Sequence, residues 1–272
     1  MPKLSQILAS FEEYWPKGHA DDWDRVGLVT GSHSQDIYKI LVAVDLTAEV
    51  IDEAIDSGAE LIVTHHPVLL KGVNYLEEDS LKGSLITKLV RANLACFSAH
   101  TNADVQTDGA SSEMARAFGL ANLRPLVATP NGFGHGVIGD LLEPQTLSDF
   151  ATRVAFALPK TARGVALAGD PYQTIVTVAI CSGAGDGFIQ SAIGSEADVY
   201  VTSDLRHHPV SDALQTPRVG RRPLALIDVS HFAAESLWVG SAITRMSKIP
   251  GVQLVASKVN TDPWAEQKEQ NA

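Results

Sequence analysis

The sequence predicts an α/β fold of two α/β domains, with a mainly parallel sheet in the first domain and the second domain inserted in the chain. Strands and helices alternate along residues 38–119 at the spacing of right-handed βαβ units, which form parallel sheets. A glycine-rich stretch at 128–136 separates this part from a second run of strands and helices. A strand followed by His-His-Pro occurs twice, at 61–67 and 201–209, which hints at two similar halves.

The first part of the chain opens with a helix at 3–15, because its apolar residues follow helical spacing and Pro16 comes next. Thr47 and Gly58 are the expected N-cap and stop of a second helix. Further helices are expected at 83–92 and 109–119, and strands at 38–45, 60–66 and 94–100.

The later part predicts a second α/β arrangement. Its strands are expected near 136–142, 164–168, 174–181, 198–204, 222–230 and 252–260. Helices are expected across 147–158, after the glycine loop 182–187, after Pro209 and from His231. We therefore predict a discontinuous first domain, residues 1–127 with 223–272, and an inserted domain, residues 128–222.

Composition narrows the classes of partner. The chain has 272 residues, 21 basic and 32 acidic, which gives a formal charge of −11. This charge disfavours non-specific binding to nucleic acid or to an anionic membrane, but it suits metal cations. We see neither a signal peptide nor a membrane span and expect a cytoplasmic protein. Cys96 and Cys181 lie in predicted strands, and two buried reduced thiols are favoured over a disulfide.

Polar side chains gather where the first three strands end. The ends are 43–45, 64–66 and 98–104, and parallel strands bring such ends to one edge of a sheet, where ligands bind. His65 and His66 close the second of these strands, and Pro67 keeps His66 extended. The alternative for this pair is an ordinary surface loop.

Two further pairs could supply ligands. His100 and Asp104 follow the third strand, although Asp104 could equally be a turn or capping residue. His231 and Glu235 are four residues apart, which places both on one face of a helix. Taken alone, that pair is more simply read as a surface ion pair.

Together the clusters favour a metal centre. Five ligands exceed what a closed zinc site needs, and a bridging carboxylate suits two neighbouring ions. The adjacent imidazoles at 65 and 66 could then each take a separate ion. The five expected ligands are His65, His66, Asp104, His231 and Glu235.

The sequence resembles the Nif-three-like dinuclear metal-centre family, whose members are often named GTP cyclohydrolase I type 2 homologues. The resemblance spans nearly the whole chain and rests on the motifs "WDRVGL" (23–28), "VAVDLT" (42–47), "THHPVLLKG" (64–72), "SAHTNAD" (98–104), "TSDLRHH" (202–208) and "IDVSHFAAE" (227–235). It implies that the same five residues bind the metal, and that His100 with the region of Asp204 and His208 lines the cavity. It also implies a toroidal homo-hexamer of two-domain subunits.

Four positions depart from the family pattern. Arg25 stands where Asn is usual, Ser203 and Ser230 stand where Gly is usual, and Ala234 stands where Thr is usual. None of these changes removes a ligand. Longer relatives carry an inserted middle domain, for which this chain is too short.

The first functional hypothesis is a metal-dependent hydrolase with two divalent ions, which could be Zn, Fe, Mn, Co or Ni. Its substrate would be a nucleotide-like or phosphorylated small molecule, with GTP ring opening as the specific candidate. His100 or His208 would carry protons. The second hypothesis is a metal-binding or interaction protein without turnover.

Four other interpretations have less support. The segment 182–187 is a loose glycine-rich pattern for a phosphate site, and 218–222 is a short basic cluster, better read as a solvated loop than as a DNA contact. Asp45 could contact a ligand from outside or simply form a turn, and Asp24 could line the cavity or cap a loop.

Overall fold

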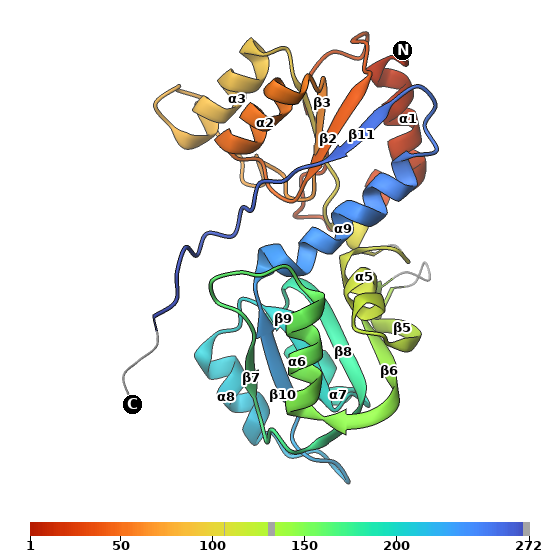
Figure 1. The fold of residues 1–272 in the computed structure, drawn as a ribbon, viewed down its shortest axis with the longest axis vertical. Helices are drawn as coiled ribbons and strands as arrows, with labels where there is room; N and C mark the ends of the chain where they lie inside the picture. The colour runs from red at the N-terminus through yellow and green to blue at the C-terminus, as the bar shows by residue number, and fades with distance from the viewer. Residues whose placement is uncertain (106, 130–133, 269–272) are drawn as a thin grey trace. The chain divides into compact units, whose positions relative to one another are not determined.

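A computed structural model describes residues 1–105, 107–129 and 134–268 of the chain (Figure 1). It contains two compact units, each built from a sheet and helices. The first unit comprises Met1–Gln106 with Trp238–Thr261, and the second comprises Thr107–Leu237 with Asp262–Ala272. The chain returns from the second unit to the first within helix α9 (His231–Met246). The predicted α/β class with two domains is confirmed.

The first unit is built on a five-stranded sheet that is mainly parallel, as predicted. Its strands, in spatial order, are β1 (Gly27–Thr30), β4 (Ala95–Ser98), β3 (Leu61–Thr64), β2 (Lys39–Ala43) and β11 (Gln253–Ala256). Of these strands, only β1 runs antiparallel to its neighbour. The inner strands read as continuous apolar runs because helices cover both faces of the sheet.

Four α-helices complete the described part of the first unit apart from α9: α1 (Leu4–Tyr14), α2 (Ala48–Ser57), α3 (Leu81–Arg91) and α4 (Thr101–Asp104), with a 3-10 turn at Lys17–His19. Helices α2 and α3 cover one face of the sheet, where Val50, Ile51 and Leu85 pack into one core with strand residues (Figure 1). Helix α1 covers the other face, with the Phe11 ring centroid 4.7 Å from that of Phe97.

Helix α2 begins and ends at the predicted residues. The Thr47 hydroxyl accepts a hydrogen bond from Val50 N (3.3 Å), and Gly58 closes the helix with φ +68°. Thr47→Ala should therefore lower the free energy of unfolding by about 1 kcal/mol, because an N–H of the first turn loses its acceptor. Urea unfolding of the full chain measures this change. Thr47→Ser keeps the hydroxyl and should unfold like the wild-type chain.

The second unit is built on a six-stranded mixed sheet. Its strands, in spatial order, are β5 (Ala121–Ala128), β6 (Gly134–Thr146), β8 (Thr174–Ala184), β9 (Val199–Ser203), β10 (Ala225–Val229) and β7 (Ala166–Ala168). Strands β8, β9 and β10 are parallel, and the remaining pairs are antiparallel.

The helices of the second unit cover both faces of this sheet. They are α5 (Ala110–Ala117), α6 (Leu147–Ala157), α7 (Ile189–Gly194) and α8 (His207–Gln215), with a 3-10 turn at Asp186–Phe188. Phe118 and Phe150 pack in the core on one face. Tyr200 and Leu226 pack in the core on the other face, against α7 and α8.

The unit boundaries differ from the predicted ones. We expected breaks near 128 and 222, whereas the units divide after Gln106 and after Leu237. Strands β5 and β10 both belong to the second sheet, so the segment 107–127 and the strand at 222–230 lie in the second unit. Residues 130–133 of the glycine-rich stretch 128–136 lie outside the described residues.

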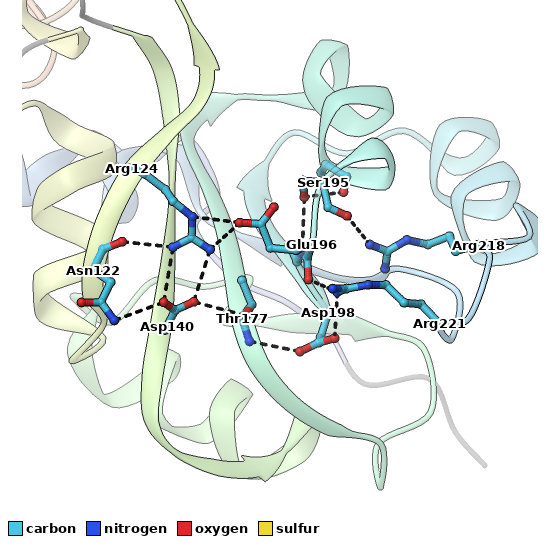
Figure 2. A network of polar contacts seen from close by, with 11 residues as sticks. Asn122, Arg124, Asp140, Thr177, Ser195, Glu196, Asp198, Arg218 and Arg221 are labelled. Carbon is cyan, nitrogen blue, oxygen red and sulfur yellow. Dashed lines mark hydrogen bonds and ion pairs between the residues drawn. The ribbon is translucent and has the colours of Figure 1, made fainter.

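The basic segment 218–222 bonds to its own unit. Arg218 donates to Ile193 O (3.1 Å) and Ser195 O (2.7 Å), at the end of α7. Arg221 donates to Glu196 O and lies 3.9 Å from Asp198 (Figure 2). These arginines therefore fasten an exposed loop to the segment that leads into β9, which is a more specific role than the solvated loop we predicted.

Asp198, directly before β9, joins the start of that strand to β8 (Figure 2). Its Oδ2 accepts hydrogen bonds from Val176 N (2.9 Å) and Thr177 N (3.0 Å) of β8. Asp198→Ala should lower the free energy of unfolding by about 1–2 kcal/mol, because both N–H groups lose their acceptor. Asp198→Asn keeps one amide oxygen and should fall between the wild-type chain and Asp198→Ala in a urea titration.

Cys96 and Cys181 are both buried and are not joined in a disulfide, as predicted. Burial raises the pKa of the Cys96 thiol to about 12, so this thiol stays protonated. Within the described part of the chain, no helix combines the length and hydrophobicity that crossing a bilayer requires.

Candidate metal centre

Four side chains of the first unit that are of metal-binding type lie together at the carboxyl edge of its sheet. His65 and His66 follow β3 directly, His100 follows β4, and Asp104 ends the short helix α4. The ligand nitrogens of the three histidines lie within 4.8 Å of one another. His65 Nε2 is 3.5 Å from Asp104 Oδ1. The predicted convergence of these strand ends is therefore confirmed.

The two adjacent imidazoles do not point to opposite faces of the sheet. Their ring centroids are 5.3 Å apart and the rings are tilted by 47°. The pair lies beyond Thr64, the last residue of β3, so strand alternation no longer governs the direction of the rings. Both rings therefore contribute to one cluster, with nitrogens close enough for the same ion or for two adjacent ions.

Each imidazole of this cluster is held through its Nδ1 atom by an oxygen that can only accept. The bonds are His65 Nδ1 to Ala99 O (2.9 Å), His66 Nδ1 to Asp45 Oδ1 (2.7 Å) and His100 Nδ1 to Asp24 Oδ1 (3.0 Å). Since carbonyl and carboxylate oxygens accept, Nδ1 must carry the hydrogen in every case. The Nε2 atom of the neutral ring then holds the lone pair that a metal ion needs.

The Asp24 carboxylate accepts several hydrogen bonds. Besides His100, it accepts from Thr101 N (3.0 Å), Thr101 Oγ1 (2.6 Å) and Arg25 N (2.7 Å). Burial opposes ionisation, but the bonds from His100 and Thr101 outweigh it and hold the pKa of Asp24 well below its usual range. The sequence allows Asp24 either to line the cavity or to cap a loop, and in the structure it lies behind His100.

A second group lies in the second unit, at the start of α9. His231 Nε2 is 3.1 Å from Glu235 Oε2, as expected for side chains one helical turn apart. His231 Nδ1 donates to Asp204 Oδ2 (2.7 Å), which repeats the arrangement seen in the first unit. This bond lowers the pKa of Asp204, with burial opposing the shift. Asp204 has φ +57°, directly after β9.

The distances in both groups fit metal coordination. Donors bound at about 2.0–2.2 Å to one ion lie about 3.0–3.5 Å apart at octahedral or tetrahedral angles. The His65–Asp104 and His231–Glu235 separations of 3.5 and 3.1 Å agree with that range. Imidazole and carboxylate donors suit Zn, Fe, Mn, Co and Ni. Both groups could therefore hold a divalent ion.

One departure from the family pattern has a structural role. The Ser230 hydroxyl accepts from Ala233 N (3.2 Å) and donates to Asp262, so it caps the helix that begins at His231. Ser for Gly thus stabilises the turn that presents this ligand. Ala234 is buried in the core of the second unit.

His208, our other candidate proton carrier, lies exposed on the first turn of α8. Its ring centroid is 5.2 Å from that of His207. The second His-His-Pro segment therefore opens a helix, whereas the first ends a strand. A catalytic role for His208 stays a prediction.

The chain is similar to known proteins of one family over most of its length. The family model described as Duf34/NIF3 (NGG1p interacting factor 3) matches residues 2–263. A Streptomyces coelicolor protein named "GTP cyclohydrolase 1 type 2 homolog" is 38% identical, with 97% of this chain and 94% of that protein covered.

Two solved structures are similar in fold. A Bacillus cereus protein related to NIF3 superposes with a TM-score of 0.87 at 24% identity, over 97% of this chain and 99% of that chain. A hypothetical protein of Staphylococcus aureus gives a TM-score of 0.85 at 27% identity, over 96% and 98%.

Proposed function

The chain belongs to the Duf34/NIF3 family, and from this premise we propose that it is a dinuclear metal-dependent hydrolase. Its substrate would be a nucleotide-like or phosphorylated small molecule. The observation that carries the proposal is the shared anchoring of the imidazoles, each of which donates from Nδ1 to an oxygen. That pattern is typical of metal-binding histidines, whose second ring nitrogen is held by a carboxylate or a carbonyl.

We propose that the chain binds two ions through the five residues that its resemblance to the family implies, which are His65, His66, Asp104, His231 and Glu235. With a carboxylate able to bridge, this donor set would hold ions about 3.5–4 Å apart, the usual spacing of two-metal hydrolases. The metal content of the purified protein, expected at two ions per chain, tests this part directly.

The bound ions would lower the pKa of a coordinated water and polarise the substrate. Within the chain, His100 would move protons through Nε2, because its Nδ1 hydrogen is donated to Asp24. The ionised Asp24 carboxylate would stabilise the imidazolium that forms when His100 accepts a proton. Asp204 and Asp45 would keep His231 and His66 oriented in the same way.

The specific reaction we propose is the opening of the GTP ring with release of formate. Its support is the name of the Streptomyces coelicolor relative, together with a centre suited to activating water. The protein should be purified with manganese, iron or zinc, incubated with GTP, and assayed for formate. Turnover that depends on the metal and is lost in Asp104→Ala supports the proposal. Formate release equal to that of Asp104→Ala would contradict it.

A second candidate is a metal-binding or interaction protein without turnover. It is favoured by the same anchoring of the rings, which binding alone would require. Tight binding of two ions with no activity on a broad panel of phosphorylated substrates would select this candidate over the hydrolase.

We also propose that the chain forms a homo-oligomer, a hexamer by its resemblance to the family. Four apolar side chains within 73–81 are exposed in the first unit: Val73, Tyr75, Leu76 and Leu81. Exposed apolar side chains close together in the chain are typical of interaction surfaces. Light scattering after size exclusion should report a mass several times 29.0 kDa, and Tyr75→Ser combined with Leu81→Ser should reduce it.

A further inference from the structure

The glycine loop that ends β8 lies directly against the metal-ligating residues of the second unit. A methyl carbon built at Gly183 would lie 2.5 Å from Glu235 Oε1 and 3.4 Å from His231 Nε2. A carbon–oxygen contact that short does not occur without a shift of one group. Only the hydrogen of glycine fits between this backbone and the Glu235 carboxylate.

Hydrogen bonds to buried side chains hold the backbone of this loop in place, so it cannot easily move away from Glu235. Ser182 N donates to Ser111 Oγ (3.0 Å), and Thr202 Oγ1 donates to Gly183 O (3.1 Å). Two residues further on, Tyr200 OH donates to Gly185 O (2.8 Å). Thr202 and Tyr200 are fully buried on β9, in the interior of the sheet. The backbone at Gly183 is therefore part of a rigid surface.

Glu235 is confined on its other side as well. Its side chain is 4% exposed, and Oε2 lies 3.1 Å from His231 Nε2. One oxygen thus faces the imidazole while the other lies over the Gly183 backbone. Because the carboxylate is buried, it has little room to turn away from an intruding side chain.

We propose that Gly183 is a positioning residue for Glu235, and that the bare backbone at 183 sets where this carboxylate can bind a metal ion. The inference rests on the proposed function, in which Glu235 is a ligand. It gives the glycine-rich segment 182–187 a role different from the phosphate site considered from sequence. A side chain at 183 should push Oε1 away and weaken metal binding at this group.

Gly183→Ala tests the inference, with Gly220→Ala as a matched control. Both glycines adopt left-handed backbone, with φ +71° and +68°, so alanine strains both alike. At Gly220 nothing lies within 4 Å of the added carbon. We expect Gly183→Ala to bind zinc or manganese about 10- to 100-fold more weakly by calorimetry, the range seen when the support of a ligand is removed. Gly220→Ala should bind like the wild-type chain.

A compensating variant separates misplacement of the ligand from damage to the fold. Glu235→Asp shortens the carboxylate side chain by one methylene, so it should relieve the clash with the methyl group that Gly183→Ala introduces. The double variant should bind metal more tightly than Gly183→Ala, although Glu235→Asp alone should bind more weakly than the wild type. Circular dichroism checks that each variant is folded. If Gly183→Ala does not fold, the metal affinity of the double variant is compared with that of Glu235→Asp alone, and we expect the two to be similar.

The possible results are distinct. Wild-type affinity in Gly183→Ala, an equal loss in Gly220→Ala, or no recovery in the double variant would overturn the inference while leaving the proposed function in place. A wild-type chain that binds no divalent ion would overturn the proposed function itself, and this inference with it.

Discussion

His65→Ala should bind divalent metal more than about 100-fold more weakly than the wild-type chain, a larger loss than removing the support of a ligand causes. His65 is fully buried, and its Nε2 lies 3.5 Å from Asp104. Metal content of the purified protein and calorimetric titration with zinc both measure the effect.

The same substitution should lower the free energy of unfolding by about 2–4 kcal/mol, because it leaves a cavity in a packed site. The imidazole packs on Trp238, with ring centroids 4.9 Å apart, and donates to Ala99 O. His33→Ala is the control, since His33 is exposed in the same unit. It should leave metal content and stability unchanged, and a loss of metal in this control would show that the assay reports general damage.

Asp24→Asn should destabilise the chain by about 2–4 kcal/mol, because it removes a buried carboxylate that accepts four hydrogen bonds. An amide offers one oxygen in place of two, and its NH₂ group would face donors from His100 or Thr101. Guanidinium unfolding near neutral pH measures the loss. Asp22→Asn, at an exposed neighbour, is the control and should change little.

The difference between wild type and Asp24→Asn should depend on pH with a definite sign. The folded-state pKa of Asp24 is held below its ordinary value of 3.8. Its contribution to stability is therefore full above that ordinary value and is lost as pH falls through the folded-state pKa. The two proteins should approach each other in stability only below about pH 4. If the difference in unfolding free energy between the two proteins stays constant from neutral pH to well below pH 4, the lowered pKa of Asp24 is contradicted.

Much of the first unit could be predicted from sequence, because its signals are local. Thr47 and Gly58 are typical capping residues and predict the ends of α2. The apolar runs of β2 and β3, separated by this helix, predict two buried parallel strands. Strand β5 was not predicted, and it contains Pro125, a residue that strands usually exclude. It is tolerated there because β5 lies at the edge of the second sheet.

The choice of sheet for β10 could not be predicted. The apolar run at 225–229 would suit either sheet, and its position beside β9 is decided by pairing with residues distant in sequence. The segment 223–237, predicted in the first domain, belongs to the second unit for that reason. The predicted boundaries followed composition, whereas the real ones follow strand pairing.

The grouping of the candidate ligands could be predicted where strand order or helical spacing brings them together. His65, His66 and Asp104 follow neighbouring parallel strands, and His231 and Glu235 are one turn apart. Asp24 could not be assigned its partner, because 76 residues separate it from His100 and no periodicity joins them. The closeness of Gly183 to Glu235 also brings together segments that are distant in the chain, and no sequence pattern predicts it.

The oxygen behind each imidazole has a kinetic consequence. Rings that are already oriented in the folded chain lose no further rotational freedom when a cation arrives. The slow step in loading such a centre would then be the loss of water from the incoming ion, which differs widely among transition metals. Which ion occupies the protein in a cell would follow exchange rates and supply, more than any rearrangement of the polypeptide.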